Sequence, residues 1–193
     1  MKKDPWIHAI VLASFCLGLG TVLAVTDRLT ANEIAALGEV LPPAHHDNDP
    51  LDDVLVFTDA HGRPVTMYRG RLEGRVSGVA YEIVGTGYAG EIRLMLGVAA
   101  DGRVLGVRTV AHRETPGLGD KIEVRKDDWI LHFTGLALGH PPADKWAVRK
   151  DGGEFDQFTG ATVTPRAVLD ALRGGLELFA AHRDTILEMS DGQ

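Results

Sequence analysis

The feature that most constrains this chain is an apolar run near its N-terminus, from Trp6 to Val25. The run contains no Asp, Glu, Lys or Arg. An α-helix rises about 1.5 Å per residue, so a helix of this length would span about 30 Å, the hydrocarbon thickness of a bilayer. The sequence therefore predicts a transmembrane helix at residues 6–25, which separates a short N-terminal end, residues 1–5, from a much longer body.

The charges on either side of this run predict how the helix crosses the membrane. Lys2 and Lys3 precede it, whereas Asp27 and Arg28 cancel one another just after it. Because positive residues stay on the cytoplasmic side, we expect the N-terminus in the cytoplasm and the body on the periplasmic side. A cleaved signal peptide is the competing interpretation, but its apolar core is usually about 7–15 residues long. The longer run and the poor cleavage site at Ala24-Val25-Thr26 favour the anchor.

The body has the composition of one globular domain with many turns. The chain has 193 residues, of which 45% are hydrophobic and 23 are glycine. Its formal net charge of -7 argues against a nucleic-acid partner, which needs a basic face. The single cysteine, Cys16, excludes a disulfide framework and a cysteine-based zinc or iron–sulfur site within the chain. We predict no metal site, because His45-His46-Asp47 lies in a polar connector where such residues are usually solvated.

The middle of the body predicts an antiparallel or mixed sheet. A short helix at residues 31–37 and a connector at residues 41–53 precede five segments with the pattern of strands. Turn residues separate these segments at residues 59–62, in a glycine-dense link at residues 85–90, and at Asp101-Gly102. The glycines of the link allow close approach of a ligand. The predicted strands are Val54–Thr58, Pro64–Tyr68, Arg75–Val84, Glu91–Ala99 and Arg103–Ala111.

The rest of the body predicts helices that pack against this sheet. Residues 120–133 have a helical pattern, whereas Trp146–Lys150 is predicted to be a short strand. The last helix is expected to open at Thr164-Pro165, because threonine is a good N-cap and proline is favoured at the first helical position. Apolar residues recur every three or four positions from Val168 to Phe179, and Gly174-Gly175 predicts a bend or close packing. The predicted fold class is α+β.

The sequence Asp156-Gln157-Phe158-Thr159-Gly160-Ala161-Thr162 stands just before that helix. A threonine hydroxyl is a poor nucleophile by itself, and the run places no base beside it. The free N–H groups and the positive dipole end of a helix start favour a phosphate group near Thr162. Gly160 and Ala161 are small, so they leave room for an enzyme that modifies Thr162, and for the molecule that supplies the modifying group, to approach. On its own, such a run is also compatible with a simple turn of small residues that enters a helix.

A second segment combines a sharp turn with hydrogen-bonding groups. It reads His112-Arg113-Glu114-Thr115-Pro116-Gly117-Leu118-Gly119-Asp120-Lys121-Ile122-Glu123. Pro116 and Gly117 predict the turn, and Gly119 lets backbone N–H groups face outward ahead of a helix. The backbone of such a loop can donate hydrogen bonds to a ligand. Taken alone, it is equally typical of a structured turn between a strand and a helix.

Together these segments resemble the G subunit of the Rnf (Rsx) ion-translocating oxidoreductase complex of bacteria. The resemblance rests on the run from Gly87 to Val98, GYAGEIRLMLGV, on the segment at residues 112–123 and on Trp146–Pro165, which occur in the family's order. It extends from the apolar run to about Ile186. The C subunit of the sodium-pumping NADH:quinone reductase is similar at a greater distance and is usually longer.

The resemblance implies a flavoprotein with a covalent cofactor. In Asp-x-x-Ser/Thr-Gly-Ala-Thr motifs, a flavin transferase joins the phosphate of FMN to the last threonine, here Thr162, as a phosphoester. Asp156, Thr159, Gly160 and Ala161 complete the motif, and Thr159 stands where Ser is common. The loop residues expected to contact the cofactor are His112, Glu114, Thr115, Pro116, Gly117, Leu118, Gly119 and Lys121.

The resemblance also implies a setting in the bacterial inner membrane. It divides the body into a membrane-proximal helix and linker at residues 26–53, a periplasmic FMN-binding domain at residues 54–187 and a tail at residues 188–193. The Rnf complex moves electrons between ferredoxin and NAD, or toward another acceptor, and couples this to movement of Na⁺ or H⁺. This chain would be a redox subunit without catalytic residues of its own, incomplete without the other subunits.

Three alternatives stay open at the level of sequence. One is a C-type subunit of the Na⁺-translocating NADH:quinone reductase. Another is a non-redox, membrane-anchored module in which Thr-Gly-Ala-Thr is only a turn. The third is a stand-alone, membrane-anchored periplasmic flavin reductase. Such a reductase needs its own acid or base, and only His112 and Glu114 offer one.

Overall fold

A computed structural model of the chain describes residues 6, 12, 14–17 and 31–188. Its contacts divide the chain into two units, Met1–Ala35 and Ala36–Gln193, and the second contains the sheet. Most of the predicted transmembrane helix at residues 6–25 lies outside the described residues, as do both of its flanks. Among the helices that are described, none has the length and hydropathy needed to cross a bilayer.

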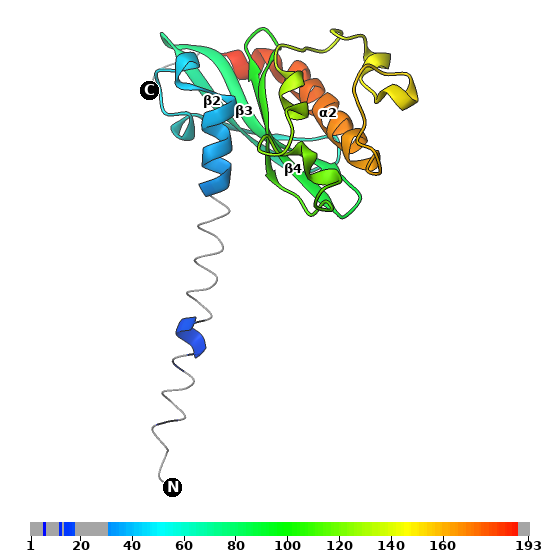
Figure 1. Cartoon of the computed structure of the whole chain (residues 1–193). Helices are drawn as coiled ribbons and strands as arrows, with labels where there is room; N and C mark the ends of the chain where they lie inside the picture. The colour runs from blue at the N-terminus through cyan, green and yellow to red at the C-terminus, as the bar shows by residue number, and fades with distance from the viewer. Residues whose placement is uncertain (1–5, 7–11, 13, 18–30, 189–193) are drawn as a thin grey trace. The chain divides into compact units, whose positions relative to one another are not determined.

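The second unit is built on a five-stranded antiparallel sheet whose strand order follows the sequence (Figure 1). Each strand therefore pairs with its neighbour along the chain through a short turn. Gly102 closes one of these turns with φ of 91°, a backbone conformation that favours glycine. The five predicted strands are confirmed, with β2 and β3 longer than expected. Their bounds are β1 Val54–Thr58, β2 Pro64–Leu72, β3 Arg75–Thr86, β4 Glu91–Ala99 and β5 Val104–Ala111.

Helix α2, Val163–Leu187, packs against β3 and β4 on one face of the sheet (Figure 1). Two glycines let it approach closely. A Cβ at Gly85 would lie 2.6 Å from the carbonyl oxygen of Ala167, and one at Gly175 would lie 2.8 Å from Ile83. The hydroxyl of Tyr81 also donates a hydrogen bond of 2.9 Å to the Gly175 carbonyl. The close packing predicted at Gly174-Gly175 is confirmed, and the helix continues through it.

A second, smaller cluster covers the opposite face of the sheet. Successive side chains of a strand point to opposite faces, so Ala80 and Met95 lie on the side away from the main core. They pack with residues 36–41, of which Val40 and Leu41 are fully buried. The predicted helix at residues 31–37 runs to residue 40. Residues 41–53, expected as a connector, contain two short 3-10 helices, η1 Pro43–His45 and η2 Pro50–Asp52.

The prediction of one helix at residues 120–133 is wrong. The segment forms two short 3-10 helices, η3 Gly119–Ile122 and η4 Trp129–Phe133. The carboxylate of Asp127 accepts a hydrogen bond of 3.0 Å from the N–H of Trp129, so η4 starts anew instead of continuing η3. Ile122, Trp129 and Phe133 still reach the core.

The predicted strand at Trp146–Lys150 is also wrong. The segment contributes an isolated parallel bridge between Val148 and Phe155, and the 3-10 helices η5 Ala143–Lys145 and η6 Arg149–Asp151 flank it. Trp146 and Val148 are buried in the main core, so the apolar pattern reflects side-chain burial and not pairing in a sheet.

Candidate functional site

Helix α2 starts at a different residue than the sequence predicts. Thr162, not Thr164, is the N-cap residue, and no side chain caps the helix. Pro165 has no N–H, and the N–H of Arg166 reaches the Thr162 carbonyl at 3.4 Å. Because the first N–H groups of a helix have no partner within it, those of Val163 and Thr164 point out of the helix end beside Thr162.

The seven-residue motif approaches this helix start along the surface. Thr159 and Gly160 are exposed and Thr162 is half-buried. Phe158 is buried, and its ring packs edge-on against Trp129 at a centroid distance of 5.0 Å. The N–H of Ala161 donates to the Phe158 carbonyl at 3.1 Å, which closes a turn. The Thr162 hydroxyl is thus displayed on a surface turn that one aromatic side chain pins to the core.

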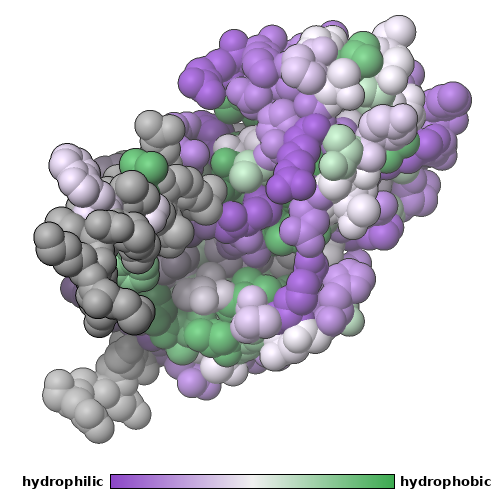
Figure 2. Space-filling model, turned by 90° about the horizontal axis from the view of Figure 1, so that it is seen from below, coloured by the Kyte–Doolittle hydropathy of each residue, from purple (hydrophilic) through white to green (hydrophobic). Residues whose placement is uncertain are grey.

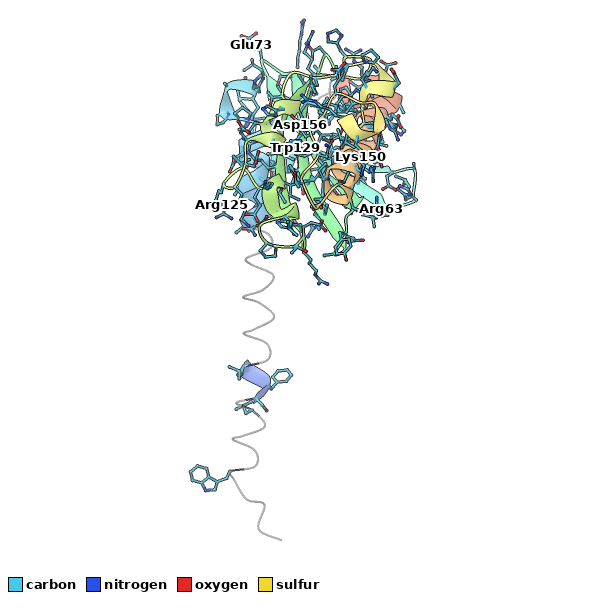
Figure 3. The ribbon with its side chains drawn as sticks, turned by 45° about the vertical axis from the view of Figure 1, so that its right-hand side comes forward. Arg63, Glu73, Arg125, Trp129, Lys150 and Asp156 are labelled. Atoms are coloured by element: carbon cyan, nitrogen blue, oxygen red, sulfur yellow. The ribbon has the colours of Figure 1, made fainter. Side chains whose placement is uncertain are left out.

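Asp156 opens the motif, and its backbone and side chain have different surroundings. Its carbonyl accepts a hydrogen bond of 2.9 Å from the indole N–H of Trp129, which fixes the backbone (Figure 3). Its carboxylate is exposed and forms a 2.9 Å ion pair with Arg149, on the exposed surface. A fixed backbone with an exposed carboxylate suits contact with a second protein.

Glu114 joins the second motif to the helix start. Its side chain is only 4% exposed. One carboxylate oxygen, Oε1, accepts a hydrogen bond of 2.9 Å from the N–H of Ala89, and Oε2 accepts a short hydrogen bond from the hydroxyl of Thr164. This bond explains why Thr164 does not cap the helix. Gly87 and Gly119 leave the room for it, since a Cβ would lie 2.5 Å from Oε1 at Gly87 and 2.7 Å from the Thr164 hydroxyl at Gly119.

A row of charged groups continues from Glu114. The backbone N–H of Glu114 donates to Nδ1 of His112 at 3.0 Å, so the neutral ring carries its proton on Nε2, which lies 3.0 Å from Glu123. Lys126 contacts both Glu123 and Asp120 at 2.8 Å. The hydrogen bond from Lys126 lowers the pKa of Glu123, against the effect of burial and with help from His112. The same lysine lowers the pKa of Asp120.

The loop residues predicted to contact the cofactor divide into an inner and an outer group. The inner group comprises Glu114 and Gly119, which are buried, and His112 and Lys121, which are half-buried. The outer group is the exposed turn of Thr115, Pro116, Gly117 and Leu118. This turn lies beside the first motif, because a Cβ added at Gly160 would lie 3.5 Å from the Leu118 side chain.

Three exposed apolar side chains lie in the segments of the site. Leu118, Val163 and Tyr88 are 41%, 42% and 78% exposed. Tyr88 directly precedes Ala89, whose N–H binds Glu114, so the three side chains come from segments that meet at that carboxylate. Seen from below, the molecule has hydrophobic side chains gathered on one part of a largely hydrophilic face (Figure 2). Sequence reasoning did not single out Tyr88 or Val163, although Tyr88 lies in the glycine-dense link and Val163 directly follows the seven-residue motif.

The groups at this helix start fit the parts of FMN. Thr162 offers a hydroxyl for an ester, and the outward N–H groups of Val163 and Thr164 suit a phosphate. Leu118 and Tyr88 offer apolar surface to a planar ring. Within the described residues, no group of three or more His, Cys, Asp and Glu side chains is arranged to hold a metal ion.

Comparison with known proteins connects this geometry to a family. A family model described as an FMN-binding domain matches residues 87–177, which include both motifs. The G subunit of the ion-translocating oxidoreductase complex of Cereibacter sphaeroides is 46% identical over 96% of this chain and 89% of its own length. The protein of the same name from Pseudomonas aeruginosa is also 46% identical, over 96% of this chain and 94% of its own.

Two solved structures share the fold. NqrC of Shewanella oneidensis has a TM-score of 0.51 and 22% identity, and the match covers 72% of this chain and 74% of that one. The C subunit of the Na⁺-translocating NADH-quinone reductase from Parabacteroides distasonis has a TM-score of 0.54 and 13% identity, with coverage of 85% and 96%. These identities support likeness of fold alone. The G-subunit relatives share sequence over nearly the whole chain, and the chain therefore belongs to the family of the G subunit of the ion-translocating oxidoreductase complex.

Proposed function

We propose that this chain is the electron-transfer subunit of a membrane-bound ion-translocating oxidoreductase of the Rnf type, and that it carries FMN attached to Thr162 as a phosphoester. Membership of the G-subunit family and the match to the FMN-binding model support the redox role. The observation that carries the attachment site is the position of Thr162, a half-buried residue of a surface turn, at a helix start that no side chain caps.

The neighbouring threonines support Thr162 as the modified residue. Thr164 is fully buried, and its hydroxyl donates to Glu114. Thr159 is exposed, but it lies before Gly160 and outside the helix start. Only Thr162 combines an accessible hydroxyl with the positive end of the helix dipole, which favours the phosphate.

Attachment needs an enzyme, because the chain lacks the groups to activate Thr162. No hydrogen bond joins the Thr162 hydroxyl to another residue in the described part of the chain. A flavin transferase would supply the base and a flavin dinucleotide donor. The bond from the flavin phosphate to the nucleoside monophosphate breaks, a new bond forms to the oxygen of Thr162, and the hydroxyl proton passes to the base.

The residues around Thr162 then hold the cofactor. FMN supplies the chemistry when bound, because it takes up and releases electrons singly or in pairs. The N–H groups of Val163 and Thr164 would hold its phosphate, and the exposed side chains of Tyr88 and Leu118 could pack against its ring. Such contacts would position the cofactor and shield part of it from water.

The same geometry argues against a self-contained flavin reductase. His112 is hydrogen-bonded through both ring nitrogens, and both carboxylate oxygens of Glu114 are engaged with Ala89 and Thr164. Both side chains are thus committed to contacts within the protein, and Glu114 is buried. A relay that passes electrons between other subunits needs no such acid or base, and is not catalytically complete alone.

We also propose that residues 6–25 anchor the chain in the inner membrane, with residues 54–187 as the periplasmic domain. The support is the apolar run with Lys2 and Lys3 before it, together with the family's place in an ion-translocating complex. The other subunits of that complex and the transferase are the partners.

The sharpest test of the attachment site is Thr162→Ala in the full chain, exported and co-expressed with a flavin transferase. We expect complete loss of covalent FMN, measured by intact mass and by in-gel flavin fluorescence, with an unchanged thermal midpoint. Thr58→Ala, the same change at an exposed strand residue outside both motifs, should keep the full adduct. Covalent FMN on the Thr162→Ala protein would overturn the assignment.

A further inference from the structure

We propose that Glu114 is a positioning residue that holds the first turn of α2 and thereby presents Thr162 for flavin attachment. It acts from behind the site, through Thr164, and does not touch the flavin. This inference rests on the proposed attachment of FMN to Thr162.

The surroundings of Glu114 are unusual for a buried carboxylate. Neither Lys nor Arg pairs with it within the described residues, and its two oxygens accept from a backbone N–H and a hydroxyl. Burying a carboxylate without a cation is costly, so packing alone would favour an apolar side chain at this position. The carboxylate supplies something that an apolar side chain lacks, namely two acceptors that point to two different segments.

The surrounding backbone is shaped for this one side chain. A Cβ at Gly87 would lie 2.5 Å from Oε1, and a Cβ at Gly119 would lie 2.9 Å from Oε2. These distances are shorter than a Cβ normally makes, so a side chain at either position would force the Glu114 carboxylate to shift. The Glu114 carboxylate is thus surrounded by three segments, namely the link at residues 85–90, the loop at residues 112–121 and the start of α2.

The contact with Thr164 has a direct consequence for Thr162. Thr164 is the second residue of α2, so a hydrogen bond to its hydroxyl fixes the first turn of the helix. That turn carries the outward N–H groups of Val163 and Thr164 and the hydroxyl of Thr162. The contact with Ala89 holds the link that carries Tyr88 in the same way. Glu114 therefore sets the relative position of the ester oxygen, the phosphate site and one wall of the ring site.

Three variants separate this role from a general effect on folding. Glu114→Gln can still accept from Ala89, and its amide can donate to the Thr164 hydroxyl, so the geometry is retained without the charge. Glu114→Ala loses both hydrogen bonds. Thr164→Val removes only the hydroxyl and keeps the shape of the side chain. Ser77→Ala is the control, because it removes a hydroxyl that donates to the carbonyls of His45 and Gly70, far from the helix start in the sequence.

The first readout is amide hydrogen exchange of residues 156–168 in the unmodified protein, with the initial rate of covalent FMN incorporation as the second. We expect Glu114→Ala and Thr164→Val to speed the exchange and to slow incorporation, each by about tenfold or more, the effect of losing one buried hydrogen bond. Glu114→Gln and Ser77→Ala should stay within about twofold of wild type in both readouts.

Each outcome decides between the roles. Unchanged exchange and incorporation in Thr164→Val would overturn the proposal, and this variant carries the test if Glu114→Ala does not fold. A Glu114→Gln protein as impaired as Glu114→Ala would show that the charge matters and not the position, which also overturns it. Wild-type protein that the transferase leaves unmodified would refute the attachment at Thr162, while the exchange measurement would still decide whether Glu114 holds the helix start.

Discussion

Two carboxylates connect segments of the domain to opposite ends of helix α2. One accepts hydrogen bonds from uncharged groups, and the other accepts them from arginines. At the start of the helix, Glu114 accepts from one hydroxyl and one backbone N–H. At its far end, Asp53 accepts from Arg69 at 2.8 Å and from Arg71 at 2.5 Å. Arg69 also donates to the carbonyl of Ile186 at 3.5 Å, in the last turn of α2.

The two ends of α2 therefore differ in what completes them. The helix has 25 residues, so its ends lie about 37 Å apart at 1.5 Å per residue. The negative end meets the buried guanidinium of Arg69 within the protein itself. The positive end has neither a side-chain cap nor an acidic residue of its own in its first turn, and the carboxylate of Glu114 reaches only the hydroxyl of Thr164 there. The C-terminal end of α2 is thus stabilised by a cation of the protein itself, whereas the N-terminal end can still bind an anion.

The largest expected effect on stability comes from removing the ion pair at the C-terminal end of α2. Asp53→Asn leaves Arg69 buried without its carboxylate, so we expect the free energy of unfolding to fall by about 3 kcal/mol. Covalent FMN per folded protein should be unchanged, because the substitution lies at the far end of α2. Urea unfolding and in-gel flavin fluorescence measure the two quantities. A loss of FMN without a loss of stability would contradict the claim that the two ends of α2 have separate roles.

The contribution of the Asp53 carboxylate should also appear in the pH dependence of stability. Burial alone would raise the pKa of Asp53, but hydrogen bonds from Arg71 and Arg69 outweigh it and bring the pKa below its ordinary value of 3.8. A carboxyl whose pKa is lower in the folded state stabilises the protein above its unfolded pKa, and this stability is lost as the pH falls through the folded pKa. Wild-type stability should therefore begin to fall near about pH 5 and continue to fall below pH 3.8.

The Asp53→Asn variant should show a shallower drop over the same pH range, measured by urea midpoints at a series of pH values. Glu123 and Asp120, whose pKa values are also lowered, continue to contribute to the slope in both proteins. Parallel curves for the wild type and the variant would mean that Asp53 does not titrate differently on unfolding.

The smallest effect on stability is expected near the start of α2. Two exposed acidic residues there can be compared directly, because each forms an ion pair with an arginine. Asp156 pairs with Arg149 at 2.9 Å, and Asp151 pairs with Arg166 at 2.6 Å. Exposed ion pairs contribute little, so Asp156→Asn and Asp151→Asn should leave the thermal midpoint unchanged. Only Asp156→Asn should slow incorporation of FMN by the transferase, because Asp156 belongs to the proposed recognition motif. Equal rates for the two variants would remove Asp156 from that motif.

The sheet was predictable from sequence because its signals are local. Alternating apolar residues and short turns such as Asp101-Gly102 mark β4 and β5 within a few residues of their observed ends. The start of α2 was not predictable, because the partner of Thr164 lies 50 residues away at Glu114. As an isolated sequence, Thr164-Pro165 has the pattern of a helix cap, and only the tertiary contact draws the hydroxyl inward.

The candidate site shows the same division. The sequence singled out both motifs, and the structure brings them together at Leu118 and Gly160. It could not show that Glu114 faces Thr164 and Ala89, since that depends on how the strands between them pair. For the same reason the packing of residues 41–53 was not foreseen, although Asp53 binds Arg69 and Arg71 of β2.

The measurement that tests the central claim most directly is peptide mapping by mass spectrometry of the full chain, purified after export and co-expression with a flavin transferase. The account predicts one FMN phosphoester, on the peptide that contains Thr162 and on that residue. An unmodified Thr162 peptide, obtained while the same transferase modifies a control substrate, would contradict it.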